Sequence, residues 1–207
     1  MHLTRSQATK KLPITRKGTK YLAKAKIDPK NSVPVVIALR EMLKLARTAK
    51  EVQKMIHLKL LKINGKEVKD FRDSIRLFNI FEADKSYKLT LNSIGKFTFE
   101  EDNSKERICK VVNKTLFRKN QLQYNLHEGT NLISKDKINI EDTLYLDFSG
   151  KIKKHAAFEK GKKCFVTSGK YSGQKGIIEE IEGKKAKIKL GNNDVPVVLE
   201  KRSVFVI

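Results

Sequence analysis

Hydrophobic side chains recur with a helical period in residues 32–57. In "SVPVVIALREMLKLAR" the apolar positions lie three or four residues apart, as they do on one face of an amphipathic helix. Ser32 can supply the N-cap of this helix, and Pro34 suits its first turn. We therefore expect a first helix from Ser32 to about Arg47.

A second, shorter helix is predicted from Ala49 to about Ile56. It follows "TAKE", in which Thr48 and Glu51 can satisfy each other's backbone N–H groups as a capping box. The pattern then changes to the alternation of "LKLLKI", and Asn64-Gly65 is a strong signal for a β-hairpin turn. Residues 33–70 are thus predicted to form a small module of two helices and a hairpin.

Short segments with alternating hydrophobicity fill the rest of the chain. Those that are rich in β-branched and aromatic residues cover 74–81, 87–92, 95–101, 106–117, 121–129, 130–134 and 142–148. Their spacing of about ten residues favours a small barrel or sandwich in a central domain, 71–155. A strand, a glycine-dense loop and a second strand lie within a C-terminal domain, 156–207, which ends with strand patterns over 186–194 and 195–207. The predicted fold class is α+β, mostly β.

Charge is distributed unevenly along the chain. The 207 residues include 45 Lys and Arg against 23 Asp and Glu, a net charge of +22. The excess is +13 over residues 1–70 and +8 over 151–207, but only +1 over 71–150. Because so high a positive charge attracts polyanions, nucleic acid is the expected partner and an anionic membrane surface is the weaker alternative.

Residues 1–32 are strongly basic and have no regular hydrophobic pattern. They contain nine Lys and Arg and a single acidic residue, Asp28. We expect an extended basic arm that is disordered alone and becomes ordered on a polyanion. The alternative is a tail that is merely solvated.

Several classes of protein are disfavoured by what the sequence lacks. No apolar segment follows the first charges, and the longest apolar run, "VPVVIAL", is too short to cross a bilayer. Cys109 and Cys164 stand alone and the four histidines show no ligand spacing, so neither a metal site nor a disulfide framework is expected. The sequence has no GxxxxGK phosphate loop and no Ser/His/Asp or Cys/His set. We therefore expect a cytoplasmic protein without enzymatic activity, cofactor or small-molecule substrate.

The candidate RNA contacts are side chains at four places: the arm, the predicted helices, the hairpin and the glycine-dense loop. On the predicted helices Arg40, Lys44 and Arg47 share the face opposite the apolar one, and further lysines extend this stripe. In the glycine-dense loop two lysines flank a tyrosine that can stack on a base, although ordinary solvated faces and a plain hairpin remain the alternatives. The full set of candidates is Arg5, Lys10, Lys11, Arg16, Lys17, Arg40, Lys44, Arg47, Lys50, Lys54, Lys66, Lys170, Tyr171 and Lys175.

Two of these segments resemble known RNA-binding motifs. Residues 35–70, with "KINGKEV" near their end, are similar to the two-helix and hairpin motif that ribosomal proteins, pseudouridine synthases and tyrosyl-tRNA synthetases share. Thr48 stands where many members of that group have serine, with Lys50 as the nearby cation. Residues 161–183, "GKKCFVTSGKYSGQKGIIEEIEG", have the glycine spacing of the KOW motif, which forms part of an SH3-like barrel.

Both motifs in this order, behind a basic arm and around a β-rich middle, resemble one family. It is small-subunit ribosomal protein four of the e-type, which "MHLTR", "NLHEGTNL", "DTLYLDFSGKI" and "SVFVI" also resemble. The resemblance implies a structural protein without enzymatic activity that binds small-subunit ribosomal RNA, contacts neighbouring ribosomal proteins and supports subunit assembly. The alternative is a KOW-containing, RNA-binding factor of transcription or translation that is not stably part of the ribosome.

Overall fold

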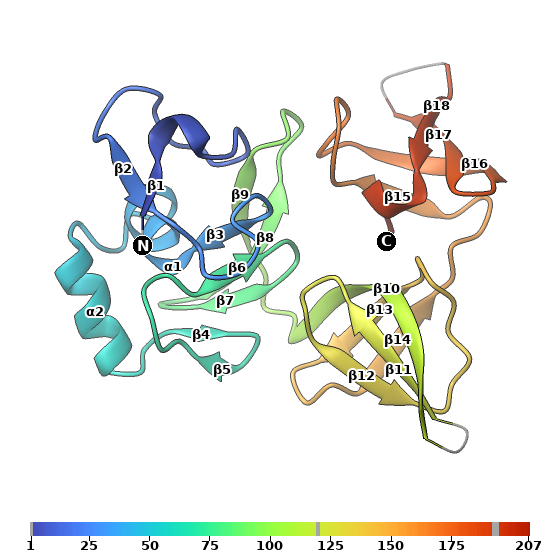
Figure 1. Cartoon of the computed structure of the whole chain (residues 1–207), viewed down its shortest axis with the longest axis horizontal. Helices are drawn as coiled ribbons and strands as arrows, with labels where there is room; N and C mark the ends of the chain where they lie inside the picture. The colour runs from blue at the N-terminus through green and yellow to red at the C-terminus, as the bar shows by residue number, and fades with distance from the viewer. Residues whose placement is uncertain (1, 119–120, 192–194) are drawn as a thin grey trace. The chain divides into compact units, whose positions relative to one another are not determined.

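The computed structural model describes residues 2–118, 121–191 and 195–207 (Figure 1). Their contacts divide the chain into two compact units. The N-terminal unit contains residues 1–92 and 96–105, and the C-terminal unit contains residues 93–95 and 106–207. Both units are built mainly from antiparallel strands, which confirms the predicted fold class, α+β and mostly β.

The basic arm is folded into the N-terminal unit. Strand β1 (His2–Thr4) pairs antiparallel with β2 (Tyr21–Ala23), and a 3-10 turn, η1 (Arg5–Gln7), follows β1. Leu12 and Ala25 are buried. The structure thus differs from the predicted extended arm, because the few apolar side chains of the arm join the core of the unit.

The first helix is shorter than predicted at both ends. Ser32 belongs to strand β3 (Ser32–Pro34), which pairs with β6 (Ser74–Arg76), so Ser32 does not cap a helix. Helix α1 (Val35–Ile37) continues as a single π-helical turn, η2 (Ala38–Met42), and ends there. Lys44 has a φ of +58°, a left-handed conformation that cannot continue a right-handed helix. The hydrophobic period therefore extends beyond the point at which the backbone leaves the helix.

The second helix begins as predicted. In α2 (Ala49–His57) the Glu51 N–H donates to Thr48 Oγ1 over 3.3 Å. The Glu51 carboxylate in turn accepts hydrogen bonds from the backbone N–H groups of Thr48 (3.5 Å) and Arg47 (2.7 Å). The predicted capping box is confirmed, and Val52 on the inner face of the helix is fully buried.

The predicted hairpin is also confirmed, and it forms one side of a five-stranded sheet. Its turn residues Asn64 and Gly65 have φ values of +50° and +76°, as Asn-Gly hairpin turns require. The strand order is β5-β4-β7-β8-β9. The strands are β4 (Lys62–Ile63), β5 (Lys66–Glu67), β7 (Ile80–Glu82), β8 (Ser86–Leu91) and β9 (Phe97–Glu101).

The C-terminal unit contains two five-stranded antiparallel sheets, ordered β12-β11-β10-β13-β14 and β18-β17-β16-β15-β19. The strands of the first sheet are β10 (Glu106–Arg118), β11 (Gln121–Leu126), β12 (Asn131–Ser134), β13 (Thr143–Asp147) and β14 (Ile152–Ala156). Those of the second are β15 (Lys163–Val166), β16 (Lys175–Glu182), β17 (Lys185–Leu190), β18 (Val197–Glu200) and β19 (Val204–Val206), with a 3-10 turn, η3 (Lys201–Ser203), before β19. Of the strand pattern over 186–194, residues 192–194 lie outside the described residues.

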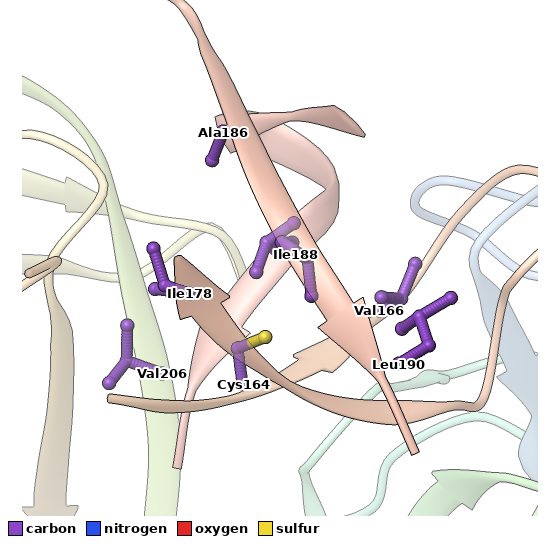
Figure 2. Packing of buried hydrophobic residues seen from close by; sticks show 8 residues of the cluster. Cys164, Val166, Ile178, Ala186, Ile188, Leu190 and Val206 are labelled. Carbon is purple, nitrogen blue, oxygen red and sulfur yellow. The ribbon is translucent and has the colours of Figure 1, made fainter. Parts of the chain in front are cut away.

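Each sheet of the C-terminal unit has its own hydrophobic core. In the first, the fully buried Tyr124, Leu144 and Leu146 pack together. Figure 2 shows the second, in which Cys164, Val166, Ile178, Ala186, Ile188, Leu190 and Val206 come together. Because side chains alternate along a strand, the residues beside these in sequence point to the outside of the sheet.

The strands predicted as one central domain, 71–155, are divided between the two units. Strands β6 to β9 belong to the N-terminal unit, and β10 to β14 belong to the C-terminal unit. A two-stranded hairpin alone is too small to be stable, so β7 to β9 complete the sheet of the β4–β5 hairpin. The four predicted segments, 1–32, 33–70, 71–155 and 156–207, remain a proposal about which parts of the chain act together.

Candidate RNA-binding surface

Arg5 stabilises the fold of the arm. Its guanidinium donates to the carbonyl oxygens of Thr15 (2.5 Å) and Thr19 (2.7 Å) and to the Thr19 hydroxyl (3.1 Å). It also occupies the space beside Gly18, where a Cβ atom would lie 2.8 Å from Arg5 Nη2. Arg5 therefore holds this loop in place. Among the described residues, two of its five N–H donors are left for another partner.

Lys11 is likewise engaged within the N-terminal unit. Its Nζ donates to Asn31 Oδ1 over 2.9 Å and lies 6.0 Å from the centre of the Phe97 ring. Burial lowers the pKa of this amine, and the Asp28 carboxylate opposes that shift. The arm candidates that the structure leaves exposed are Lys10, Arg16 and Lys17.

The cations of the predicted helical stripe come from three different pieces of backbone. All five are exposed: Arg40, Lys44, Arg47, Lys50 and Lys54. Arg40 lies in η2, and its Nε donates to the Arg47 carbonyl oxygen over 3.2 Å. Lys50 and Lys54 lie one turn apart on α2 and share a face. The prediction of one helical face is wrong for Lys44 and Arg47, because the first helix ends before them and both lie in a loop.

Lys66 is exposed on the β4–β5 hairpin. Its neighbour Glu67 instead pairs with Lys59, whose Nζ lies 3.3 Å from the carboxylate. Within the described part of the chain Lys66 has no carboxylate within ion-pair distance, so its charge is available to a ligand.

The glycine-dense loop between β15 and β16, together with the first residue of β16, exposes its two cations and not its tyrosine. Gly169 and Gly173 have φ values of +85° and +89°, so the course of the loop depends on glycine. Lys170 and Lys175 are exposed, whereas Tyr171 is half-buried against the core of the second sheet. Lys170 Nζ lies 5.8 Å from the centre of the Tyr171 ring. Tyr171 therefore contributes to packing, and its stacking on a base stays a prediction.

Sequence reasoning missed two lysines, Lys163 and Lys189, on the outer face of the second sheet. Lys163 is paired in register with Ile177, and Ile177 with Lys189, so the three side chains lie side by side. Both lysines are exposed, and with Lys175 they line a cavity of about 440 Å³. Alternating lysines in the strand patterns were the available signal, but the register that aligns separate strands is set by tertiary packing. We call Lys163, Lys175 and Lys189 the barrel cations.

Two carboxylates hold the end of the arm to the segment after the hairpin. Lys26 Nζ lies 3.2 Å from Asp70 and 3.0 Å from Asp73. The Arg72 guanidinium donates twice to the Asp70 carboxylate, over 3.3 and 3.0 Å. Chiefly because of Arg72, and also because of Lys26, the pKa of Asp70 lies well below its usual value. Lys26 and Arg72 are therefore engaged in ion pairs within the unit.

A buried lysine joins the two sheets of the C-terminal unit. Lys110 on β10 is only 2% exposed, and its Nζ lies 2.6 Å from Glu141 Oε2. The same Nζ donates to the carbonyl oxygens of Lys201 and, over 2.6 Å, of Val204, at the end of the second sheet. Burial lowers the pKa of this amine, and Glu141 opposes that shift. We call this arrangement the Lys110 joint.

The remaining candidates for a functional site are metal-binding side chains and the nucleophilic thiols of the two cysteines. No three His, Cys, Asp or Glu side chains of the described residues are placed to hold a metal ion. Burial raises the pKa of the Cys164 thiol to about 11 and that of the Cys109 thiol well above its usual value, so both stay protonated at neutral pH. Within the described ranges, no helix is long and apolar enough to cross a membrane.

Known proteins match this chain along most of its length. The ribosomal family S4e matches residues 83–152, and the KOW motif matches residues 160–190. Small ribosomal subunit protein eS4 of Methanocella arvoryzae is 33% identical over 189 residues, which are 87% of this chain and 81% of that protein. The protein of that name from Methanococcus aeolicus is 31% identical over 201 residues, 88% and 82% of the two chains. The crystal structure of 30S ribosomal protein S4e from Thermoplasma acidophilum has a TM-score of 0.73 and 25% identity, over 86% of this chain and 95% of that one.

Proposed function

Because the chain belongs to the family of small ribosomal subunit protein eS4, we propose that it is a structural constituent of the small ribosomal subunit. In this role it binds ribosomal RNA and supports the folding of that RNA during subunit assembly. The observation that carries the proposal is the 33% identity to a named subunit protein over 87% of the chain. A KOW-containing factor outside the ribosome is not favoured, because the matched region extends far beyond the KOW motif.

Exposed cations without carboxylate partners support RNA binding by both units. Among the described residues, none of the following lies within ion-pair distance of a carboxylate: Lys10, Arg16, Lys17, Lys44, Lys50 and Lys54 of the N-terminal unit, and the barrel cations of the C-terminal unit. Such cations bind phosphates and so position a protein on RNA without reading its sequence.

The same role implies the protein's neighbours and its place in the cell. Its partners are small-subunit ribosomal RNA and adjacent small-subunit proteins, and its location is the cytoplasmic ribosome. The family is structural, so we expect purified protein to hydrolyse neither nucleotides nor RNA. Turnover that disappears on substitution of one carboxylate, such as Asp147, would contradict this expectation.

Sedimentation of ribosomes after a high-salt wash tests membership of the subunit. We expect the tagged protein to remain with the small subunit at about one copy per particle. If it is released completely and is recovered with RNA polymerase, the alternative factor is correct.

Filter binding to small-subunit ribosomal RNA over a range of salt concentrations tests the cation contacts. Replacing Lys44, Arg47, Lys50 and Lys54 with alanine should lower the magnitude of the salt slope by about two to four units, since each phosphate contact releases counterions. The matched control replaces four lysines that are already paired with carboxylates, Lys59, Lys85, Lys153 and Lys187. The control removes the same charge but should change the slope less. Equal slopes for the two quadruple variants would show that net charge alone, and not this surface, determines binding.

A further inference from the structure

The folded arm lines a solvent-accessible cavity, whose lining includes three of the candidate RNA contacts, Arg5, Lys10 and Arg16. The cavity has a volume of about 690 Å³ and lies within the N-terminal unit. Its lining comes from residues 5–16, from Leu22 on β2 and from Lys96 just before β9. We call it the arm pocket.

The charged side chains of the arm pocket are all positive. They are Arg5, Lys10, Arg16 and Lys96, and none of the described lining residues is acidic. In the described structure Lys10, Arg16 and Lys96 are exposed and lie outside ion-pair distance of any carboxylate. Arg5 is held by its three hydrogen bonds to Thr15 and Thr19, so its guanidinium is a fixed planar group with donors to spare. The pocket therefore favours an anion that approaches from solvent.

The rest of the lining is partly apolar. Ala8, Leu12, Ile14 and Leu22 contribute apolar side chains, and Ser6, Thr9 and Thr15 contribute hydroxyl groups. A phosphate alone gains nothing from the apolar side chains. An unpaired nucleotide has both parts of the matching chemistry, because its base can contact apolar side chains or stack on a guanidinium while its phosphate binds cations.

We propose that the arm pocket accepts one unpaired nucleotide of an RNA chain. The base lies among Ala8, Leu12 and Ile14, and the adjoining phosphates are bound by Lys10, Arg16 and Lys96. The proposal rests on the proposed function, because it assumes that the chain is held on ribosomal RNA. The surface described above contacts phosphates. The arm pocket would be an additional site on it, which binds one extruded base.

The test fills the pocket without removing any charge. In Ala8→Phe the new ring occupies the space of the base, whereas in the control Gln7→Phe the same ring is placed on an exposed neighbour outside the lining. With protein-free small-subunit ribosomal RNA, Ala8→Phe should bind at least about fivefold more weakly, the lower limit for losing one stacked base. The salt slope should stay unchanged, and Gln7→Phe should bind like the wild type. Equal affinity of Ala8→Phe and wild type overturns the proposal.

Ultraviolet crosslinking of the wild-type complex keeps the test decisive if Ala8→Phe fails to fold. Mass spectrometry should find one RNA nucleotide joined to the peptide that contains residues 8–14. Absence of any crosslink in this peptide, with crosslinks elsewhere in the chain, overturns the proposal. If the wild type does not bind the RNA at all, the proposed function fails as well, so the two failures can be distinguished.

A third experiment distinguishes a nucleotide within an RNA chain from a free nucleotide as the ligand. A mixture of the four nucleoside 5′-monophosphates at 1 mM should neither displace the RNA nor protect the pocket peptide from crosslinking. Displacement or protection at that concentration would make free nucleotide the ligand and would overturn the assignment to RNA.

Discussion

At Gly176 the strands β16 and β17 approach so closely that no side chain can be accommodated. A Cβ atom there would lie 2.5 Å from the carbonyl oxygen of Lys189 and 2.8 Å from Ile188 Cγ2. The carbonyl belongs to a paired strand, so it cannot move aside without disturbing the pairing. This glycine of the KOW segment is therefore required for sheet packing.

We predict that Gly176→Ala destabilises the C-terminal unit by about 1–3 kcal/mol, as overpacking of a well-filled site does. The matched control is Gly191→Ala, because none of the described residues lies within 4 Å of a Cβ atom at Gly191. Urea unfolding at neutral pH measures both variants. If their midpoints are equal, the close approach at Gly176 does not limit stability.

Asp70 should make stability depend on pH in the acidic range. Its pKa in the folded chain is lowered by Arg72 first and by Lys26, whereas in the unfolded chain it returns to about 3.9. A carboxyl group whose pKa is depressed by folding stabilises the fold above its unfolded pKa, and this contribution is lost as the pH falls through the folded value.

We therefore expect Asp70→Asn to be less stable than the wild type at pH 7, with a difference that shrinks steadily below about pH 4. Urea unfolding of both proteins at pH 7, 4, 3 and 2 measures the difference. A difference that stays constant over this range would mean that the Asp70 charge contributes nothing to stability.

Among the elements, helix α2 depends most visibly on its first turn. It is nine residues long and has only one fully buried side chain, Val52. Its capping box satisfies the N–H of Glu51 and, through the Glu51 carboxylate, the N–H groups of Arg47 and Thr48. The same hydrogen bonds fix the loop that carries two of the candidate cations.

Removing the cap should therefore affect both stability and binding. We expect Thr48→Ala to lower the free energy of unfolding by about 1 kcal/mol, the usual cost of losing a threonine cap. Thr48→Ser keeps the accepting oxygen and serves as the control. Thermal unfolding and RNA filter binding measure the two effects, and equal behaviour of the alanine and serine variants would contradict the role of the cap.

Elements with a local signal were predicted correctly from the sequence. The capping box at Thr48 and the Asn64-Gly65 turn each depend on a few adjacent residues. The alternation of apolar and polar side chains in the strands is also visible within a short segment. The first helix was predicted too long because its apolar period continues beyond Met42, while the left-handed Lys44 ends the helix and pairing with β6 draws Ser32 into a strand.

The candidate site was predicted only in part, because the charge of a residue does not show whether its side chain is bonded within the fold or faces solvent. Arg5 and Lys10 look alike in the sequence, yet Arg5 holds the 15–19 loop and Lys10 faces solvent. Lys163 and Lys189 are separated along the chain and become neighbours only through the register with Ile177. Such pairings follow from tertiary packing, which no short window of sequence contains.

For the molecule as a whole, the Lys110 joint is a buried connection with a large expected effect on stability. Removing one partner of a buried ion pair leaves the other charge uncompensated, which costs about 3–5 kcal/mol. Here the carbonyl oxygens of Lys201 and Val204 also lose their donor. The cost should fall on both sheets of the C-terminal unit together.

We predict that Lys110→Met destabilises the C-terminal unit by about 3 kcal/mol or more, and that adding Glu141→Leu recovers part of the loss. The control is Lys153→Met, which breaks the exposed pair with Glu106 and should cost less than about 1 kcal/mol. Urea unfolding measures all three variants. Equal losses for Lys110→Met and Lys153→Met would show that the buried joint contributes no more than a surface pair.

The joint also sets an order of events during synthesis of the chain. Lys110 is made 94 residues before Val204, whose carbonyl oxygen it binds. At a translation rate of 5–20 residues per second this delay is roughly 5–20 s. During that time the N-terminal unit, whose residues 1–92 and 96–105 are all made before Lys110, can already fold. The C-terminal unit cannot complete its fold during this time. Lys110 stays in water, and β15 lacks its neighbour β19. A chain that terminates before residue 204 therefore lacks the closing strand of one sheet and the acceptors of a lysine in the other.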